Sequence, residues 1–229
     1  MKKIAISQSN YIPWRGYFDL IASVDEFIIF DDMQYTKRDW RNRNKIKTKD
    51  GPLWLSIPVK VKGKYFQKIK EAEIDGQSWK NSHWKSLKSS YSKAPFFEDL
   101  SSELEKIYFE ENYIYLSELN RRLIELICNY LEITTKIRDS SEFNLKNGKT
   151  ERLVNICKDL NACEYVTGPS AKNYIDQNIF KENKIKLSYI NYSKYGSYRQ
   201  LWGGFVDNLS ILDLIFNCGR KCYEHMQYI

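Results

Sequence analysis

The sequence lacks long apolar runs, and this absence excludes several kinds of protein. No stretch of its 229 residues approaches the roughly 20 consecutive apolar residues that span a bilayer. The N-terminus turns polar at Ser7 and Gln8, which is too soon for the apolar core of a signal peptide. We therefore expect a cytoplasmic protein that does not insert into a membrane.

Histidine and cysteine are also scarce, which narrows the chemistry of any site. Five cysteines, an odd number spread over predicted helical segments, indicate reduced thiols. Cys218 and Cys222 lie four residues apart and close to His225 in sequence. A zinc site needs about four ligands, however, and the second histidine, His83, is distant in sequence. We therefore expect no metal site. Gly-x-Ser-x-Gly and Walker patterns are absent, which disfavours a serine hydrolase or a P-loop kinase.

The sequence does contain enough apolar residues for a core, and an excess of positive charge. Hydrophobic residues make up 42 % of the chain and aromatic residues 15 %, so a folded domain is expected rather than disorder. The formal net charge of +7 favours an anionic partner. That partner is a nucleotide sugar, a nucleic acid or an acidic membrane surface, and composition alone does not choose among them.

Short apolar segments alternate with amphipathic ones along the chain, a pattern typical of a parallel sheet. We predict one α/β domain over residues 1–229, with a Rossmann-like, mostly parallel sheet and an inserted helical lobe at residues 77–131. Residues 61–74 alternate lysine with apolar residues and predict a ribbon or loop-strand. The predicted strands are residues 3–7, 26–30, 53–59, 134–139, 165–167 and 185–190. The predicted helices are residues 17–24, 79–91, a segment after Pro95, 114–131, 150–160, a start at 171–176 and 209–216.

Two loops are predicted to open at the same edge of this sheet. Residues 8–16 follow the first strand, and residues 31–47 follow the second. The strands would be parallel, so both loops leave from carboxyl ends, where open α/β sheets bind ligands. We therefore assign both loops to one site.

The second loop, DDMQYTKRDWRNRNKIK, mixes cations with amides and aromatic residues. We expect Arg38, Arg41 and Arg43 to bind a diphosphate, because guanidinium groups match phosphate oxygens. Asn42 and Asn44 alternate with these cations and are expected to hydrogen-bond a sugar or a base edge. The alternative is a solvated loop whose charges only keep the protein soluble.

Three segments together resemble the WbqC-like family, and the resemblance covers nearly the whole chain. They are residues 8–19 (QSNYIPWRGYFD), residues 31–47 and residues 209–217 (LSILDLIFN), with Ser9 standing where the family usually has proline. Members lie among genes for bacterial O-antigen and related surface glycans. The resemblance implies a transferase that adds an acyl group, such as glycine, to the amino group of a nucleotide-linked amino sugar. The acyl donor stays open among an aminoacyl-adenylate, an aminoacyl-tRNA and a thioester, and no cofactor is implied.

A second likeness concerns residues 10–16, directly after the first strand. They look like the loop with which nucleotidylyl transferases hold a nucleotide at a helix N-terminus. The histidines of that superfamily's motif are absent, and Trp14 and Tyr17 fall near their places. A nucleotide-binding enzyme of this type is therefore one alternative.

An amide-forming transfer needs a base for the sugar amine, and His83 is the most economical candidate. The unperturbed pKa of histidine, about 6.5, suits proton transfer near neutrality. A helix-surface or buried, hydrogen-bonded histidine is the competing interpretation. Asp31 and Asp32 are the other catalytic candidates, although either could instead pair with an arginine and only shape the loop.

The remaining candidates are predicted to bind substrate. Ser170 and Lys172 follow a Gly-Pro turn before a helix, a geometry that suits an anion or a plain helix cap. The full set of candidate substrate-binding residues is Gln8, Asn10, Tyr11, Trp14, Tyr35, Lys37, Arg38, Trp40, Arg41, Asn42, Arg43, Asn44, Ser170 and Lys172. A different class of function, nucleic-acid binding by residues 37–49 with Tyr35 and Trp40 as stacking platforms, also fits this loop.

Overall fold

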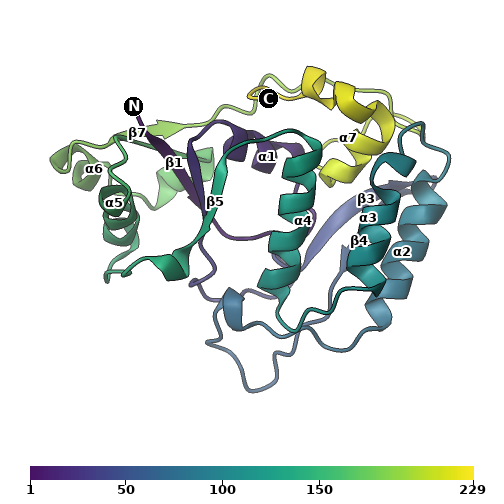
Figure 1. The fold of residues 1–229 in the computed structure, drawn as a ribbon, viewed down its shortest axis with the longest axis horizontal. Helices are drawn as coiled ribbons and strands as arrows, with labels where there is room; N and C mark the ends of the chain where they lie inside the picture. The colour runs from purple at the N-terminus through teal and green to yellow at the C-terminus, as the bar shows by residue number, and fades with distance from the viewer.

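The computed structural model describes residues 1–229 and is built around a five-stranded sheet (Figure 1). The strands lie in the order β5-β2-β1-β6-β7, and each neighbouring pair is parallel, as predicted. Their bounds are β1 Lys3–Ser7, β2 Glu26–Ile29, β5 Lys136–Asp139, β6 Glu164–Thr167 and β7 Lys186–Tyr189. The chain runs outward from β1 through β2 to β5 and then returns to the other side of β1. This is the Rossmann order, with its switch point between β1 and β6.

Helices cover both faces of the sheet because successive strand residues point to opposite sides. Ala5, Phe27 and Ile29 belong to the larger hydrophobic cluster, which they share with α1 (Arg15–Ala22), α4 (Leu116–Tyr130) and α7 (Ile211–Cys218). Ile4 and Ile28 belong to the smaller cluster, which includes α5 (Lys149–Asp159) and α6 (Gln177–Glu182). The sheet therefore separates two cores of unequal size.

A long insertion separates β2 from β5 and contains the helical segment predicted at residues 77–131. It consists of the hairpin β3 (Arg43–Thr48) and β4 (Gly51–Ser56), the short 3₁₀ turn η1 (Ile69–Glu71), and helices α2 (Ser78–Tyr91), α3 (Glu98–Phe109) and α4. Figure 1 shows the hairpin, α2 and α3 at the end of the molecule opposite α5 and α6. The larger core is continuous through this insertion, since Trp84, Leu104 and Leu123 share it with Ala5.

Three predictions of local structure were wrong. Residues 43–48 form the antiparallel strand β3 rather than loop, because Asn44 and Ile46 turn inward opposite Leu55 and Leu53. Residues 61–74 form no ribbon; they run as a loop in which isolated bridges join Lys68 to Gln34, Glu73 to Tyr115 and Ile74 to Val59. The helix expected at residues 171–176 is instead the 3₁₀ turn η3 (Pro169–Asn173). Helix α6 begins at Gln177, and the Asp176 side chain caps it by accepting a hydrogen bond from the Asn178 backbone at 2.9 Å.

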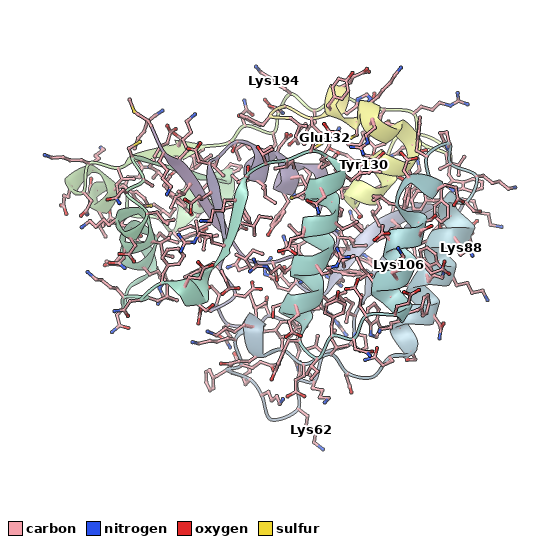
Figure 2. All side chains as sticks on the ribbon, viewed as in Figure 1. Lys62, Lys88, Lys106, Tyr130, Glu132 and Lys194 are labelled. Atoms are coloured by element: carbon pink, nitrogen blue, oxygen red, sulfur yellow. The ribbon has the colours of Figure 1, made fainter.

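The C-terminal segment after β7 runs back over α1 and is tied to it by two buried charged residues. Arg15 donates to the carbonyl oxygen of Gly196 at 3.0 Å, and Asp19 accepts from the Tyr195 hydroxyl at 2.5 Å. Asp19 also accepts from the backbone of Gln227 at 3.0 Å. Figure 2 shows Lys194 at the outer edge of this segment. The segment ends in α7 and the 3₁₀ turn η4 (Gly219–His225).

The exterior is strongly charged, and none of the helices is both long and apolar enough to cross a bilayer. Figure 2 shows Lys88 on α2 and Lys106 on α3 pointing outward, and Lys62 at the end of the loop that projects below the hairpin. The 3₁₀ turn η2 spans Ser140–Glu142, directly after β5.

Gly219 should tolerate a methyl group much less well than Gly203. Both glycines have a positive φ, +58° and +52°, but a Cβ at Gly219 would lie 2.5 Å from the Phe96 ring, whereas Gly203 faces open space. We expect Gly203→Ala to lower the free energy of unfolding by about 1 kcal/mol through backbone strain. Gly219→Ala adds overpacking of about 1–3 kcal/mol. Urea denaturation of both variants tests this, and equal losses would contradict the packing at Phe96.

Candidate functional site

The carboxyl edge of the sheet holds one buried acid, Asp31, directly after β2. Its side chain is 2 % exposed, and its Oδ1 accepts a hydrogen bond from the Ser9 backbone at 2.8 Å. Its Oδ2 is also buried and has no hydrogen-bond partner. Burial raises the pKa of Asp31 to about 6, against the lowering effects of hydrogen bonds from Ser9 and of the Arg41 charge. A carboxyl with a near-neutral pKa and an unpartnered oxygen is suited to accept a proton.

The polar groups around Asp31 come from three distant parts of the chain. Ser9 and Asn120 are both fully buried, and the Asn120 amide donates to the Ser9 hydroxyl at 3.2 Å. The same amide donates to the Arg41 carbonyl oxygen at 2.9 Å. Asn120 lies on α4, so the helical insertion fixes both loops of the carboxyl edge. The Asn120 Oδ1 is a second buried acceptor without a donor.

Arg41 spans the two loops at this edge. Its guanidinium donates to the Asn10 side-chain oxygen at 2.5 Å and to the Gln8 side-chain oxygen at 2.9 Å. Its only acidic partner within ion-pair distance is Asp39, at 3.8 Å. The prediction that the two loops meet at one edge is therefore confirmed. Two neutral amides and one distant carboxylate leave much of the guanidinium charge available to an anion.

The loop after β1 has an unusual backbone held by its neighbours. Ile12 has a φ of +37°, a conformation that β-branched residues rarely adopt, and its side chain is fully buried. The Asn44 amide donates to the Ile12 carbonyl oxygen at 2.7 Å, and the Tyr11 backbone donates to the Trp40 carbonyl oxygen at 3.0 Å. Strained backbone of this kind persists only where the surroundings fix it, and it occurs often at functional sites.

The loop after β6 forms the other side of the switch point. The Arg41 charge reaches Tyr174, where it opposes the raised pKa that burial gives the phenol. Lys172 lies with its Nζ 5.0 Å from the centre of the Tyr189 ring, and the Tyr189 hydroxyl is buried without a partner. Ser170 and Lys172 are exposed, and Ser170 caps no helix, because Gly168 precedes the 3₁₀ turn.

Asp32 has a structural environment that differs from that of Asp31. Its Oδ1 lies 2.7 Å from Lys70 Nζ and 3.0 Å from Lys68 Nζ, and its Oδ2 accepts from the Ser140 hydroxyl at 3.0 Å. Burial opposes ionisation, but the hydrogen bonds from Lys70, Lys68 and Ser140 outweigh it and lower the pKa of Asp32. This carboxylate joins the loops after β2, β4 and β5, and we assign it that role.

His83 lies in the core rather than at the carboxyl edge. It is 4 % exposed, and its Nδ1 lies 2.9 Å from the Tyr11 hydroxyl, which in turn lies 2.6 Å from the Tyr108 hydroxyl. Burial lowers the pKa of His83 to about 4. A neutral imidazole surrounded by Tyr11, Tyr108 and Trp79 favours the structural alternative over a catalytic base.

Four of the predicted substrate-binding residues turn inward and make contacts within the protein. Tyr11, Tyr35, Asn42 and Asn44 are all buried. The Asn42 amide donates to the Ile57 carbonyl oxygen at 2.8 Å, as Asn44 does to Ile12, so both amides position backbone rather than face solvent. Both side chains are short and lie close to buried backbone carbonyl groups, which need hydrogen-bond donors.

The other predicted residues of the second loop lie at the surface. Lys37 and Arg38 are exposed and make no ion pair. Trp40 is 43 % exposed and packs on Trp54 at 5.5 Å between ring centres. The Arg43 guanidinium lies 4.3 Å from the Trp54 ring centre. Of the predicted arginines, only Arg41 joins Asp31 at the carboxyl edge.

Several residues of the site were not predicted from the sequence, although the sequence pattern could have indicated one of them, Asn120. Asn120 interrupts the apolar stripe of α4, and a polar residue on a buried helix face needs partners. Ser9 and Tyr174 carry no such signal. No group of three or more histidine, cysteine or acidic side chains is placed to hold a metal ion, and all five cysteines are free thiols.

Comparison with known proteins identifies relatives of this arrangement. The model of the WbqC-like protein family matches residues 8–225. The uncharacterized protein Rv1507c of Mycobacterium tuberculosis is 54 % identical over 228 residues, which covers 100 % of this chain and 99 % of that protein. No solved structure matches.

The two neighbouring aspartates should affect stability with opposite dependence on pH. A raised pKa means that the folded state favours protonated Asp31. The contribution of this carboxyl to the free energy of unfolding is therefore fully present below about pH 4 and is lost as the pH rises through about 6. The loss approaches about 3 kcal/mol. Asp31→Asn lacks this penalty, so its stability relative to the parent should rise between pH 4 and pH 8.

Asp32→Asn is the matched control, because the pKa of Asp32 is lowered and the sign reverses. Its stability relative to the parent should stay nearly constant from about pH 5 to pH 8 and should rise only as the pH falls below about 4, where the parent loses the contribution of ionised Asp32. Urea denaturation at several pH values measures both. If the stability difference between Asp31→Asn and the parent did not change with pH, the Asp31 carboxyl would titrate like an exposed aspartate.

Proposed function

Because this chain belongs to the WbqC-like family, we propose that it is a transferase that acylates the amino group of a nucleotide-linked amino sugar. Glycine is one acyl group that fits, and the family resemblance supports a setting in bacterial surface-polysaccharide biosynthesis. The observation that carries the proposal is the pairing at the carboxyl edge. Asp31, with a pKa of about 6, feels the charge of an arginine whose closest partners are neutral amides.

Asp31 supplies the base that amide formation needs. The sugar nitrogen attacks the acyl carbonyl carbon, a C–N bond forms, and the bond from that carbon to the donor's oxygen or sulfur leaving group breaks. The amine proton passes to Asp31 Oδ2, the oxygen that has no partner in the protein. A base with a pKa near 6 is ionised at neutral pH and still accepts a proton well, which the ion-paired Asp32 does not.

Arg41 supplies the phosphate contact. A guanidinium binds phosphate oxygens through parallel N–H donors. Asp31 is almost fully covered, and Arg41 is among its charged neighbours. Transfer at Oδ2 therefore requires the groups that cover this oxygen to move when the substrate binds. The acyl donor is an activated ester or thioester, with aminoacyl-tRNA as one source.

A transfer assay with matched variants tests this proposal. The protein is incubated with nucleoside-diphosphate amino sugars and with an aminoacyl-tRNA, an aminoacyl-adenylate or an acyl thioester, and the products are read by mass spectrometry. We expect Asp31→Asn to keep substrate binding but lose about 100-fold or more in turnover. Arg41→Ala should weaken nucleotide-sugar binding by about 1.5–3 kcal/mol.

Lys62→Ala is the control, because Lys62 is exposed, makes no ion pair and lies on the loop that projects below the hairpin. It should bind and react like the parent. Failure of every nucleotide amino sugar to bind at millimolar concentration would refute the proposal. So would full turnover by Asp31→Asn, and melting curves would exclude unfolding as the cause of any loss.

A further inference from the structure

A small cavity adjoins Arg41 on the side of the loop after β1. Its volume is about 270 Å³, and it is lined by Asn10, Pro13, Trp14, Trp40, Asn44 and Asn208. We propose that this cavity binds the nucleobase of the substrate, an inference that rests on the proposed transfer to a nucleotide-linked sugar. The volume suits one planar ring system rather than a whole nucleotide sugar.

Two indole rings give the cavity the walls that a base requires. Trp14 is fixed, because its ring covers Gly16 and packs on Tyr192 at 4.9 Å between ring centres. Trp40 is 43 % exposed, so part of its ring is open to a ligand. Nucleobases stack on such aromatic faces, which accept any base because every base has a π-face.

The polar groups of the cavity are neutral amides that match base edges. The Asn208 side chain is exposed and makes no hydrogen bond within the protein. Asn10 uses its oxygen to accept from Arg41, which leaves its NH₂ group without a protein acceptor. Asn44 contributes only a wall, since its amide is bonded to Ile12. Carboxamides pair with the donor and acceptor edges of bases.

The lack of charge in the cavity lining argues against binding of the diphosphate or the amino group of the substrate in this cavity. No charged side chain lines it, so neither a phosphate nor an ammonium group would find a counter-charge there. Asn10 links the cavity to Arg41, and the charge of Arg41 acts on Asp31. Base, diphosphate and amino sugar, in their covalent order, then lie at the cavity, at Arg41 and at Asp31.

Calorimetric titration of the full chain tests the assignment without any acyl donor. The probes are inorganic pyrophosphate, and UDP, ADP, GDP and dTDP. We expect at least one nucleoside diphosphate to bind about tenfold or more tightly than pyrophosphate, because stacking of its base adds to the phosphate contact. Trp40→Ala should remove this advantage and leave pyrophosphate binding unchanged. Asn208→Asp, which suits the left-handed backbone at φ +58°, should reduce it and keep the fold.

Phe66→Ala is the matched control, because Phe66 is 82 % exposed but neither lines the cavity nor packs on Trp40. It should keep the advantage of the nucleotide. Equal affinity for pyrophosphate and all four nucleotides would overturn the inference, as would an advantage that survives both Trp40→Ala and Asn208→Asp. Equal losses in Trp40→Ala and Phe66→Ala would also overturn it, since they would point to stacking on exposed aromatic rings in general.

The outcomes separate this inference from the proposed function. Trp40-dependent nucleotide binding with no acyl transfer to any amino sugar would support the base site and refute the transferase. Equally efficient transfer to an amino-sugar phosphate that lacks a base would support the transferase and overturn the base site.

Discussion

The burial of one carboxyl group at the carboxyl edge of the sheet is the constraint on which the site depends. Asp31 is bonded to the Ser9 backbone, so the ends of β1 and β2 are joined at the point where their loops diverge. Asn120 then connects Ser9 to Arg41. Holding this carboxylate in a nearly dry position opposes stability at neutral pH, and such costly groups are retained mainly where they act. The surrounding fold supplies the stability that this group does not.

Each part of the fold contributes something to that edge. The parallel sheet places the loops after β1, β2 and β6 together, and the Rossmann order leaves its switch point between β1 and β6. The inserted helices contribute Asn120, and the hairpin contributes Asn44, which holds the strained Ile12. The C-terminal segment, anchored by Arg15 and Asp19, brings Tyr192 against Trp14. The insertion and the C-terminal segment therefore complete the site as well as the core.

Sequence patterns could predict the sheet and the meeting of the two loops, because both follow from strand periodicity and parallel connections. They could not predict β3, since one of its inward residues is Asn44, whose burial depends on a carbonyl group of another loop. The burial of His83 could have been predicted in part, because it lies on the same helix face as Trp79, Leu87 and Tyr91, which pack into the core. Which of two adjacent aspartates would be ion-paired depended on Lys68, Lys70 and Ser140, and these contacts are set by tertiary structure alone.

The state of the Asp31 carboxyl is the central claim, and it can be measured directly. The ¹³C carboxyl resonances of the aspartates are followed by NMR from pH 3.5 to pH 8, and Asp31 is assigned by its absence in Asp31→Asn. We predict a pKa of about 6 for this group, because burial outweighs the stabilising contacts of the charged form. A pKa at or below about 4, the ordinary value of an exposed aspartate, would contradict the account of the site.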